Sequence, residues 1–151
     1  IDARTLTAMY DAGCRAIMWG AESFSDKVLA DIKKGATEDD IWHSLRLAHD
    51  AGIGNWVFLM VGSYKETPRD LAHTEKCLQK AVAEDLVQWC QVTICTTEPG
   101  TELWRLAAEE GWLVEQPEVG PQMHQVYAPT PWLSKKEIRL WRARLLRAGP
   151  E

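Results

Sequence analysis

Short apolar stretches alternate with helical patterns along this chain, and that alternation limits the possible folds more than any other feature of the sequence. Residues 15–20, 55–62 and 88–95 have the length of strands and too few polar residues for a strand with one wet face. Residues 39–51 and 69–84, which lie between them, carry apolar side chains at helical spacing. Strands joined through helices by short connections run parallel. The sequence therefore predicts an α/β fold of parallel βα units.

Polar residues mark where three of the predicted helices begin. Each start has a hydroxyl residue as N-cap and, three positions later, an acidic residue. In the first two cases the acidic residue lies near the positive end of the helix dipole, and in the third it completes a capping box. The pairs are Thr37 with Asp40, Thr67 with Asp70, and Ser134 with Glu137. The last helix should turn Ile138, Trp141 and Leu145 inward, which leaves its lysines and arginines as a solvated face.

Composition argues against several classes of partner. The 151 residues and 46% hydrophobic content fit a single domain with one core. A net charge of −5 argues against nucleic acid, because phosphate binding requires a basic surface. No apolar run approaches the roughly 20 residues needed to span a bilayer, and no secretory signal opens the sequence. We therefore expect neither a membrane nor nucleic acid among the partners.

The cysteines and histidines show no metal-site spacing. None of the four cysteines forms a CxxC pair or lies at zinc-finger distance from a histidine; they are Cys14, Cys77, Cys90 and Cys95. Unpaired thiols are typical of a reducing compartment, so the predicted localisation is cytoplasmic. His73 falls in a helical stretch, where a surface or hydrogen-bonded histidine is the default interpretation.

Ligands of parallel sheets bind beyond the carboxyl ends of the strands, so the residues there are the first candidates for a site. Glu22 and Ser23 follow the first predicted strand. Their side chains either cap the next helix or, in the case of the Glu22 carboxylate, accept hydrogen bonds from a diol or an ammonium group. The residues at this strand end leave both interpretations open.

The ends of the other two predicted strands carry similar ambiguities. Gly62 allows either a close approach of a ligand or a tight turn, and helix capping explains Glu66 and Thr67. Thr96 and Thr97 follow the third strand, before a Pro-Gly turn signal. The tryptophans within the strands are explained by core packing; they are Trp19, Trp56 and Trp89.

Several short segments recur here in an order that is typical of one known family. They are Asp11-Ala12-Gly13-Cys14, Gly20-Ala21-Glu22-Ser23, Lys34-Gly35-Ala36-Thr37, Phe58-Leu59-Met60-Val61-Gly62 with Glu66-Thr67, and Glu98-Pro99-Gly100-Thr101. Over roughly residues 6–113 the chain resembles the radical S-adenosylmethionine (radical SAM) superfamily. The resemblance is greatest to the branch whose members often carry an N-terminal cobalamin-binding domain.

This resemblance implies a fold and a set of cofactor-binding residues. The fold would be part of a partial TIM-type (βα)6 barrel, with its C-terminal half and strands four to six in residues 1–115. Residues 116–151 would form a C-terminal extension with a terminal helix. Glu22, with Ser23 beside it, would contact the ribose or methionyl end of SAM, and Lys34 its carboxylate. The residues that would flank the adenine are Met60, Gly62, Thr96 and Thr97.

The resemblance also implies a chemistry for which this chain lacks one part. In the family, three cysteines of a CxxxCxxC motif hold a [4Fe–4S] cluster at which SAM is reductively cleaved to a 5′-deoxyadenosyl radical. That motif does not occur here, and the proline–glycine pair usual before Glu-Thr is replaced by Tyr64-Lys65. We therefore expect a fragment of a radical SAM enzyme that is inactive alone. Its cluster ligands would lie upstream of Ile1, and cobalamin would be a further cofactor of that branch.

The partners expected for such a fragment are the remainder of the barrel, an upstream domain, and a small-molecule or peptide substrate. An open parallel sheet also leaves a strand edge free, which predicts self-association of the isolated piece. Two alternatives remain at this point. One is a non-catalytic α/β module that binds a nucleoside or scaffolds a partner, and the other is an unrelated parallel α/β protein with well-capped loops.

Overall fold

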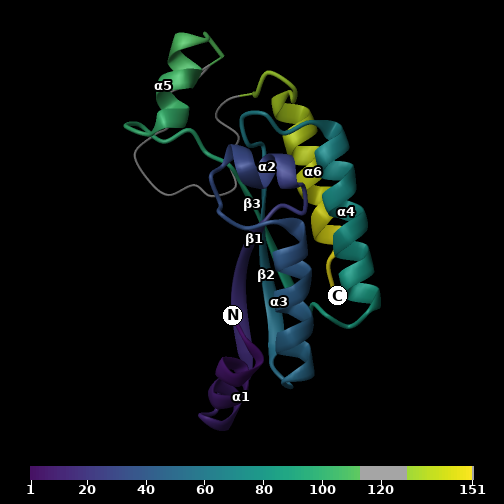
Figure 1. Ribbon diagram of the computed structural model, residues 1–151. Helices are drawn as coiled ribbons and strands as arrows, with labels where there is room; N and C mark the ends of the chain where they lie inside the picture. Colours follow the sequence, from purple (N-terminus) through teal and green to yellow (C-terminus); the bar gives the residue numbers. More distant parts are fainter. Residues whose placement is uncertain (113–128, 151) are drawn as a thin grey trace.

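A computed structural model of the chain describes residues 1–112 and 129–150, where three parallel strands form a sheet in the order β1-β2-β3 (Figure 1). The predicted boundary at residue 115 lies outside the described residues. The strands are β1 (Ala16–Glu22), β2 (Gly54–Val61) and β3 (Trp89–Ile94). The helices are α1 (Ala3–Asp11), α2 (Asp26–Asp31), α3 (Glu38–Asp50), α4 (Pro68–Ala83), α5 (Glu102–Glu109) and α6 (Lys135–Ala148). The predicted parallel βα units are confirmed.

The predicted helix starts are also confirmed. Thr37, Thr67 and Ser134 each accept a hydrogen bond from the backbone N–H three residues on, and the acidic residue at that position bonds back to the capping residue. Such capping boxes satisfy backbone donors that the first helical turn leaves free, and each contributes about 1 kcal/mol. These local contacts fix where α3, α4 and α6 begin, independently of the rest of the fold.

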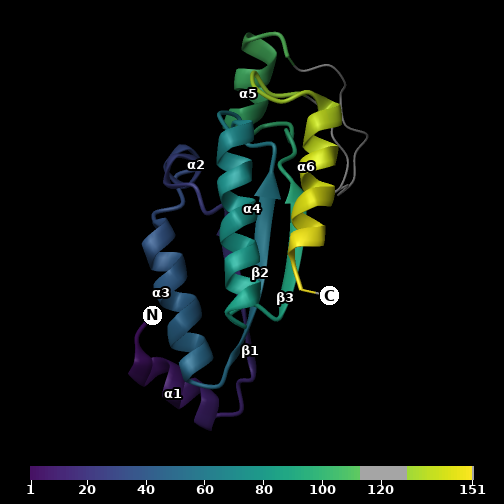
Figure 2. The same cartoon turned by 90° about the vertical axis from the view of Figure 1, so that its right-hand side faces the viewer.

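Helices α3, α4 and α6 cover one face of the sheet and enclose the main core (Figure 2). The core residues of β2 alternate along the strand: Val57, Leu59 and Val61 are fully buried against these helices. From α6, Ile138, Trp141 and Leu145 point into the same core, as predicted from their spacing. No helix in the described part of the chain is long and apolar enough to span a membrane.

The opposite face of the sheet is uncovered by any described helix, and it carries large apolar side chains. Register places Met18, Trp56 and Trp89 side by side across the three strands, and these side chains are 63%, 37% and 40% exposed. The Trp56 and Trp89 rings lie 5.6 Å apart, and Phe58 packs edge-on against Trp89. The prediction that core packing explains Trp56 and Trp89 is therefore wrong. They lie on the side of the sheet that no described helix covers.

Asn55 is the polar centre of the covered face. Its fully buried side chain accepts a hydrogen bond from the Trp19 indole at 2.7 Å and donates to the carbonyl oxygens of Leu45 and Leu86 at 2.9 and 2.8 Å. One amide thus joins β1, α3 and the segment that leads into β3. Such a buried group stabilises the fold only while all of its partners are present.

Candidate functional site

A carboxylate and an ammonium group meet at the carboxyl end of β1. Glu22 Oε1 lies 3.2 Å from Lys34 Nζ, and both side chains are about one-quarter to one-third exposed. A Cβ added at Gly20 would lie 2.9 Å from that carboxylate oxygen and 3.1 Å from the lysine nitrogen. Gly20 lies on the uncovered face, two residues after Met18, so the charged pair lies over that face and close to the glycine.

The backbone is unusual where it presents Glu22. The pairing between β1 and β2 shifts between Gly20 and Glu22, and Glu22 has a φ of 63°. A non-glycine residue in this left-handed region costs of order 1 kcal/mol. The regular pairing of β1 thus ends at the residue that contacts Lys34. The strand end therefore holds an ion pair in a conformation that strand propensity does not explain.

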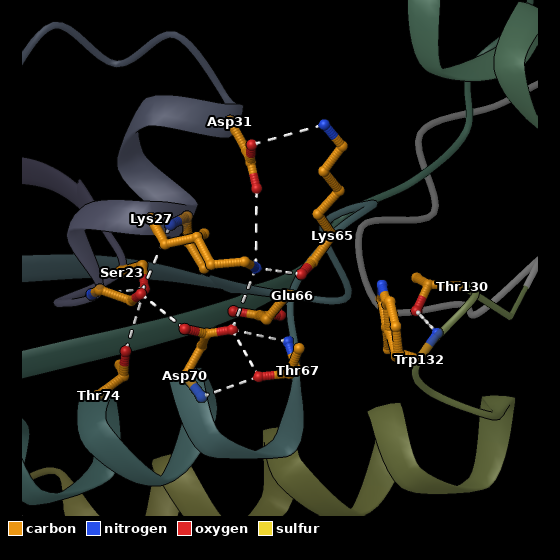
Figure 3. Close-up of polar contacts among 12 residues, drawn as sticks. Ser23, Lys27, Asp31, Lys65, Glu66, Thr67, Asp70, Thr74, Thr130 and Trp132 are labelled. Atoms are coloured by element: carbon orange, nitrogen blue, oxygen red, sulfur yellow. Dashed lines mark hydrogen bonds and ion pairs between the residues drawn. The ribbon is translucent and has the colours of Figure 1, made fainter.

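Ser23, the neighbour of Glu22, makes different contacts. Its hydroxyl is fully buried, lies 3.0 Å from Thr74 Oγ1 and accepts a hydrogen bond from the backbone N–H of Ser25 (Figure 3). These contacts join the β1–α2 loop to α4. The structure thus places Ser23 beside Glu22 in sequence, with its hydroxyl engaged in packing rather than turned to the uncovered face. A role for Ser23 in cofactor binding stays a prediction.

An adjoining network fixes the loop after β2. The Asp70 carboxylate accepts hydrogen bonds from the Thr67 backbone N–H, the Thr67 hydroxyl and the Ser25 hydroxyl, and it pairs with Lys27 (Figure 3). Burial alone would raise the pKa of Asp70, but the bonds from Thr67 and Ser25 hold it at about 2. Lys27 also donates to the carbonyl oxygen of Lys65. The loops after β1 and β2 are thereby tied together at the same end of the sheet.

Met60 and Gly62 differ in what surrounds them at the end of β2. Met60 is half-buried and lies in register with Thr93, in the alternation of Trp56 and Phe58 on the uncovered face. Gly62 has a φ of 90°, and a Cβ there would lie 3.3 Å from the Ile138 side chain of α6. The tight-turn interpretation of Gly62 is thus supported by its conformation and by helix packing. Met60 remains available to a ligand on the uncovered face.

Glu66 is buried rather than exposed at a helix start. Its side chain is 1% exposed, and Oε2 accepts a hydrogen bond of 2.7 Å from the Gly62 backbone N–H. Burial raises the pKa of Glu66 to about 7, although the backbone N–H groups of Gly62 and Ser63 oppose that shift. The interpretation of Glu66 as a capping residue is therefore wrong, whereas Thr67 does cap α4. In the sequence, the signal that Glu66 is not a capping residue was its position directly before the N-cap residue Thr67, from which its side chain has no partner within α4.

Buried polar atoms without partners gather in the loops after β2 and β3. Within the part of the chain that the structure describes, Ser63 Oγ, Glu66 Oε1 and Thr97 Oγ1 are buried and have no hydrogen-bond partner. Native proteins rarely leave such atoms unsatisfied, so each needs a group that these contacts do not supply. Thr96, next to Thr97, is half-buried. Of the residues predicted to flank an adenine, Thr97 is therefore the one with a hydroxyl that is buried without a partner.

A pocket of about 420 Å³ opens at this end of the sheet. Its wall comes from the end of α2, the loop after β2, the residue after β3, and α5; it includes Lys33, Ser63, Tyr64, Cys95, Glu102 and Leu106. Burial raises the pKa of the Cys95 thiol to about 12, and the Glu66 and Glu22 carboxylates add to the shift. Cys95 is therefore a neutral thiol near both carboxylates.

Of the groups that the resemblance implies, the side chains present fit SAM but not the iron–sulfur cluster. Glu22 and Lys34 offer a carboxylate and an ammonium group to the charged and hydroxyl groups of SAM, and the unpartnered Thr97 hydroxyl offers a further polar contact. The four cysteines are all free and come from a loop, α4, β3 and the residue after β3. They form no ligand set for an iron–sulfur cluster.

Comparison with known proteins agrees with this geometry. Residues 1–78 match the radical SAM superfamily, so the chain belongs to that superfamily. It is 30% identical over 107 residues to an uncharacterized methyltransferase of Pyrococcus horikoshii, covering 71% of this chain and 22% of that protein. It is also 30% identical over 103 residues to a candidate methylthiotransferase of Methanocaldococcus jannaschii, covering 68% of this chain and 22% of that protein. The chain thus spans about a fifth of the length of these relatives.

Solved structures confirm the fold. Elp3 of Methanocaldococcus infernus superposes with a TM-score of 0.61 at 19% identity, over 73% of this chain and 25% of that one. Coproporphyrinogen III oxidase (HemN) of Escherichia coli, a radical SAM enzyme, superposes with a TM-score of 0.61 at 21% identity, over 99% of this chain and 30% of that one. The three parallel strands therefore correspond to part of a radical SAM barrel, as predicted.

Proposed function

We propose that this chain forms part of the SAM-binding surface of a radical SAM enzyme. The observation that carries the proposal is the Glu22–Lys34 pair, held over Gly20 at the open face of the sheet. Glu22 would accept hydrogen bonds from the ribose hydroxyls or the methionyl ammonium, and Lys34 would bind the methionyl carboxylate. Met60 and the backbone around Thr96 and Thr97 would lie beside the adenine.

The cluster belongs to the rest of the protein in this proposal. When bound, a [4Fe–4S] cluster supplies the electron that cleaves SAM to a 5′-deoxyadenosyl radical. The names of the two relatives support methyl or methylthio transfer as the class of reaction. If that transfer passes through cobalamin, as the branch resemblance implies, another domain would bind it. The residues of this chain contribute by orienting SAM and excluding water from it.

Removing the Glu22 carboxylate is expected to weaken SAM binding by about tenfold or more, because a hydrogen bond to a charged group contributes roughly 1.5–3 kcal/mol. Calorimetric titration of the 151-residue chain with SAM, parent against Glu22→Ala, measures this. The matched control is Glu84→Ala, which removes a partly exposed carboxylate paired with Arg46 on the helical side. Equal affinity of the parent and Glu22→Ala, or no binding by the parent, would contradict the proposal.

The non-catalytic alternative is separated by a second measurement. A module that only binds a nucleoside should bind adenosine as tightly as SAM, because it has no use for the methionyl end. The proposed site should prefer SAM, and Lys34→Met should reduce that preference with little effect on adenosine. If the parent and Lys34→Met show the same preference for SAM over adenosine, the result would favour the non-catalytic alternative.

The uncovered face, we further propose, packs against the remainder of the barrel. Trp56, Trp89 and Met18 form an exposed apolar surface on it, and among the described residues β1 and β3 each have one unpaired edge. Self-association of the isolated chain should therefore weaken severalfold in Trp89→Lys. Sedimentation velocity at several concentrations measures this. The control is Trp132→Lys, since Trp132 is exposed but lies in the loop before α6. A parent chain that stays monomeric would contradict the proposal.

A further inference from the structure

A glutamate, a histidine and a cysteine converge on the outer, helical side of the molecule, away from the uncovered face. Glu38 is the first residue of α3, and His73 and Cys77 lie one turn apart on α4. His73 Nε2 is 2.7 Å from Glu38 Oε2, Cys77 Sγ is 3.4 Å from Glu38 Oε1, and Cys77 Sγ is 3.6 Å from His73 Nε2. Three potential ligand atoms thus lie within 4.8 Å of one another.

We propose that these three residues form a divalent transition-metal site of the zinc type, which joins α3 to α4. Zn²⁺ and Co²⁺ favour this mixture of sulfur, nitrogen and carboxylate oxygen, whereas Mg²⁺ and Ca²⁺ favour oxygen ligands alone. The site is independent of the SAM-binding proposal, because its ligands lie between helices that cover the other face of the sheet.

The spacing of the ligand atoms fits a tetrahedral metal. With bonds of about 2.3 Å to sulfur and about 2.0 Å to nitrogen or oxygen, sulfur lies ~3.5 Å from each other ligand and nitrogen ~3.3 Å from oxygen. The two distances from Cys77 Sγ already have this value. The contacts involve both oxygens of Glu38, Oε1 toward Cys77 and Oε2 toward His73. Coordination through one oxygen therefore requires the carboxylate to rotate and the 2.7 Å contact between His73 Nε2 and Glu38 Oε2 to open to about 3.3 Å.

The surroundings hold the ligands in place and leave one position open. Trp42, one turn along α3, donates its indole N–H to Glu38 Oε1 at 3.0 Å, the kind of outer hydrogen bond that orients metal-binding carboxylates. Cys77 is buried at the base of the cluster, while about half of the His73 side chain is exposed. Solvent therefore reaches the cluster from the His73 side, which provides an entry path and a water as fourth ligand.

Cobalt titration of the 151-residue chain tests the site, because Co²⁺ reports its own ligands. Binding at the cluster should produce the visible bands of tetrahedral Co²⁺ and a sulfur-to-cobalt charge-transfer band, and Zn²⁺ should displace both. His73→Gln, at a side chain that is about half exposed, should weaken binding at least tenfold. Cys77→Ser should abolish the charge-transfer band, while Cys14→Ser, which removes a thiol in the loop before β1, should leave it unchanged.

Three results would overturn the proposal. They are the absence of a charge-transfer band in the parent chain, a band that persists in Cys77→Ser, and an affinity unchanged by His73→Gln. Thermal unfolding gives a second readout: Zn²⁺ should raise the midpoint of the parent and of Cys14→Ser but not that of His73→Gln. Equal midpoints with and without Zn²⁺ in the parent would also count against the site. Zn²⁺ should not change the affinity of the chain for SAM. If the metal site proves absent, the proposed function is therefore unaffected.

Discussion

Asn55→Ala is expected to lower the free energy of unfolding by about 3 kcal/mol or more, because it leaves two buried carbonyl groups and one half-buried indole without their hydrogen bonds. The Trp19 indole loses its acceptor, and the carbonyl oxygens of Leu45 and Leu86 lose a shared donor. Leu45 and Leu86 are buried, so water cannot take the place of the lost donor at their carbonyl oxygens. Urea unfolding, followed by circular dichroism, measures the change.

A neighbouring strand offers a control for this substitution. Gln91 lies on β3 and is half-buried on the uncovered face, so Gln91→Ala should change stability by no more than about 0.5 kcal/mol. Asn55→Asp should be nearly as destabilising as alanine, because a carboxylate keeps the bond from Trp19 but opposes the two carbonyl oxygens. An Asn55→Ala chain as stable as Gln91→Ala would show that this amide does not hold the three segments together.

The stability of the parent chain is expected to fall by about 3 kcal/mol as the pH rises from 4.5 to 7, and Glu66 is the reason. Burial raises the pKa of Glu66 from its ordinary 4.5 to about 7 in the folded chain. Within that interval the unfolded chain releases the proton while the folded chain retains it, so unfolding becomes easier with rising pH. Well above pH 7 the carboxyl is ionised in both states, and the contribution stays constant.

Glu66→Gln isolates this effect, because the amide keeps an oxygen for the Gly62 N–H and never ionises. The variant should lose the fall in stability between pH 4.5 and 7, which urea unfolding at several pH values would show. Glu98→Gln, which changes an exposed carboxylate in the loop before α5, should behave like the parent. A Glu66→Gln chain with the parent's pH dependence would contradict the assignment.

The local features of the fold could be predicted from the sequence, because they depend on neighbouring residues. The starts of α3, α4 and α6 follow from hydroxyl–acid pairs three residues apart, and the strands follow from short apolar stretches. Glu22 was expected at a strand end and Lys34 was named only through the family resemblance; the structure brings the two into contact. What the pattern could not supply is which face of the sheet the helices leave uncovered, so Trp56 and Trp89 were misplaced.

Features that depend on distant residues had no such signal. From the sequence, Asn55 was interpreted only as the first residue of a strand. Its hydrogen-bond partners could not be predicted, because they lie ten to 36 residues away in the sequence. His73 and Cys77 have helical spacing, but Glu38 reaches them only because α3 packs beside α4, 35 residues away. Burial of Glu66 likewise depends on how the loop after β2 folds back on Gly62.

Because the backbone at Glu22 is left-handed, stability and cofactor binding favour different residues at this position. Glycine would relieve the conformational cost at this position, and asparagine would lower it, but neither could offer a carboxylate to Lys34. Selection for thermal stability alone would therefore favour replacement of this glutamate, whereas selection for cofactor binding would retain it. Whether a related protein keeps an acidic residue at the position of Glu22 therefore indicates which of these two kinds of selection has acted on it.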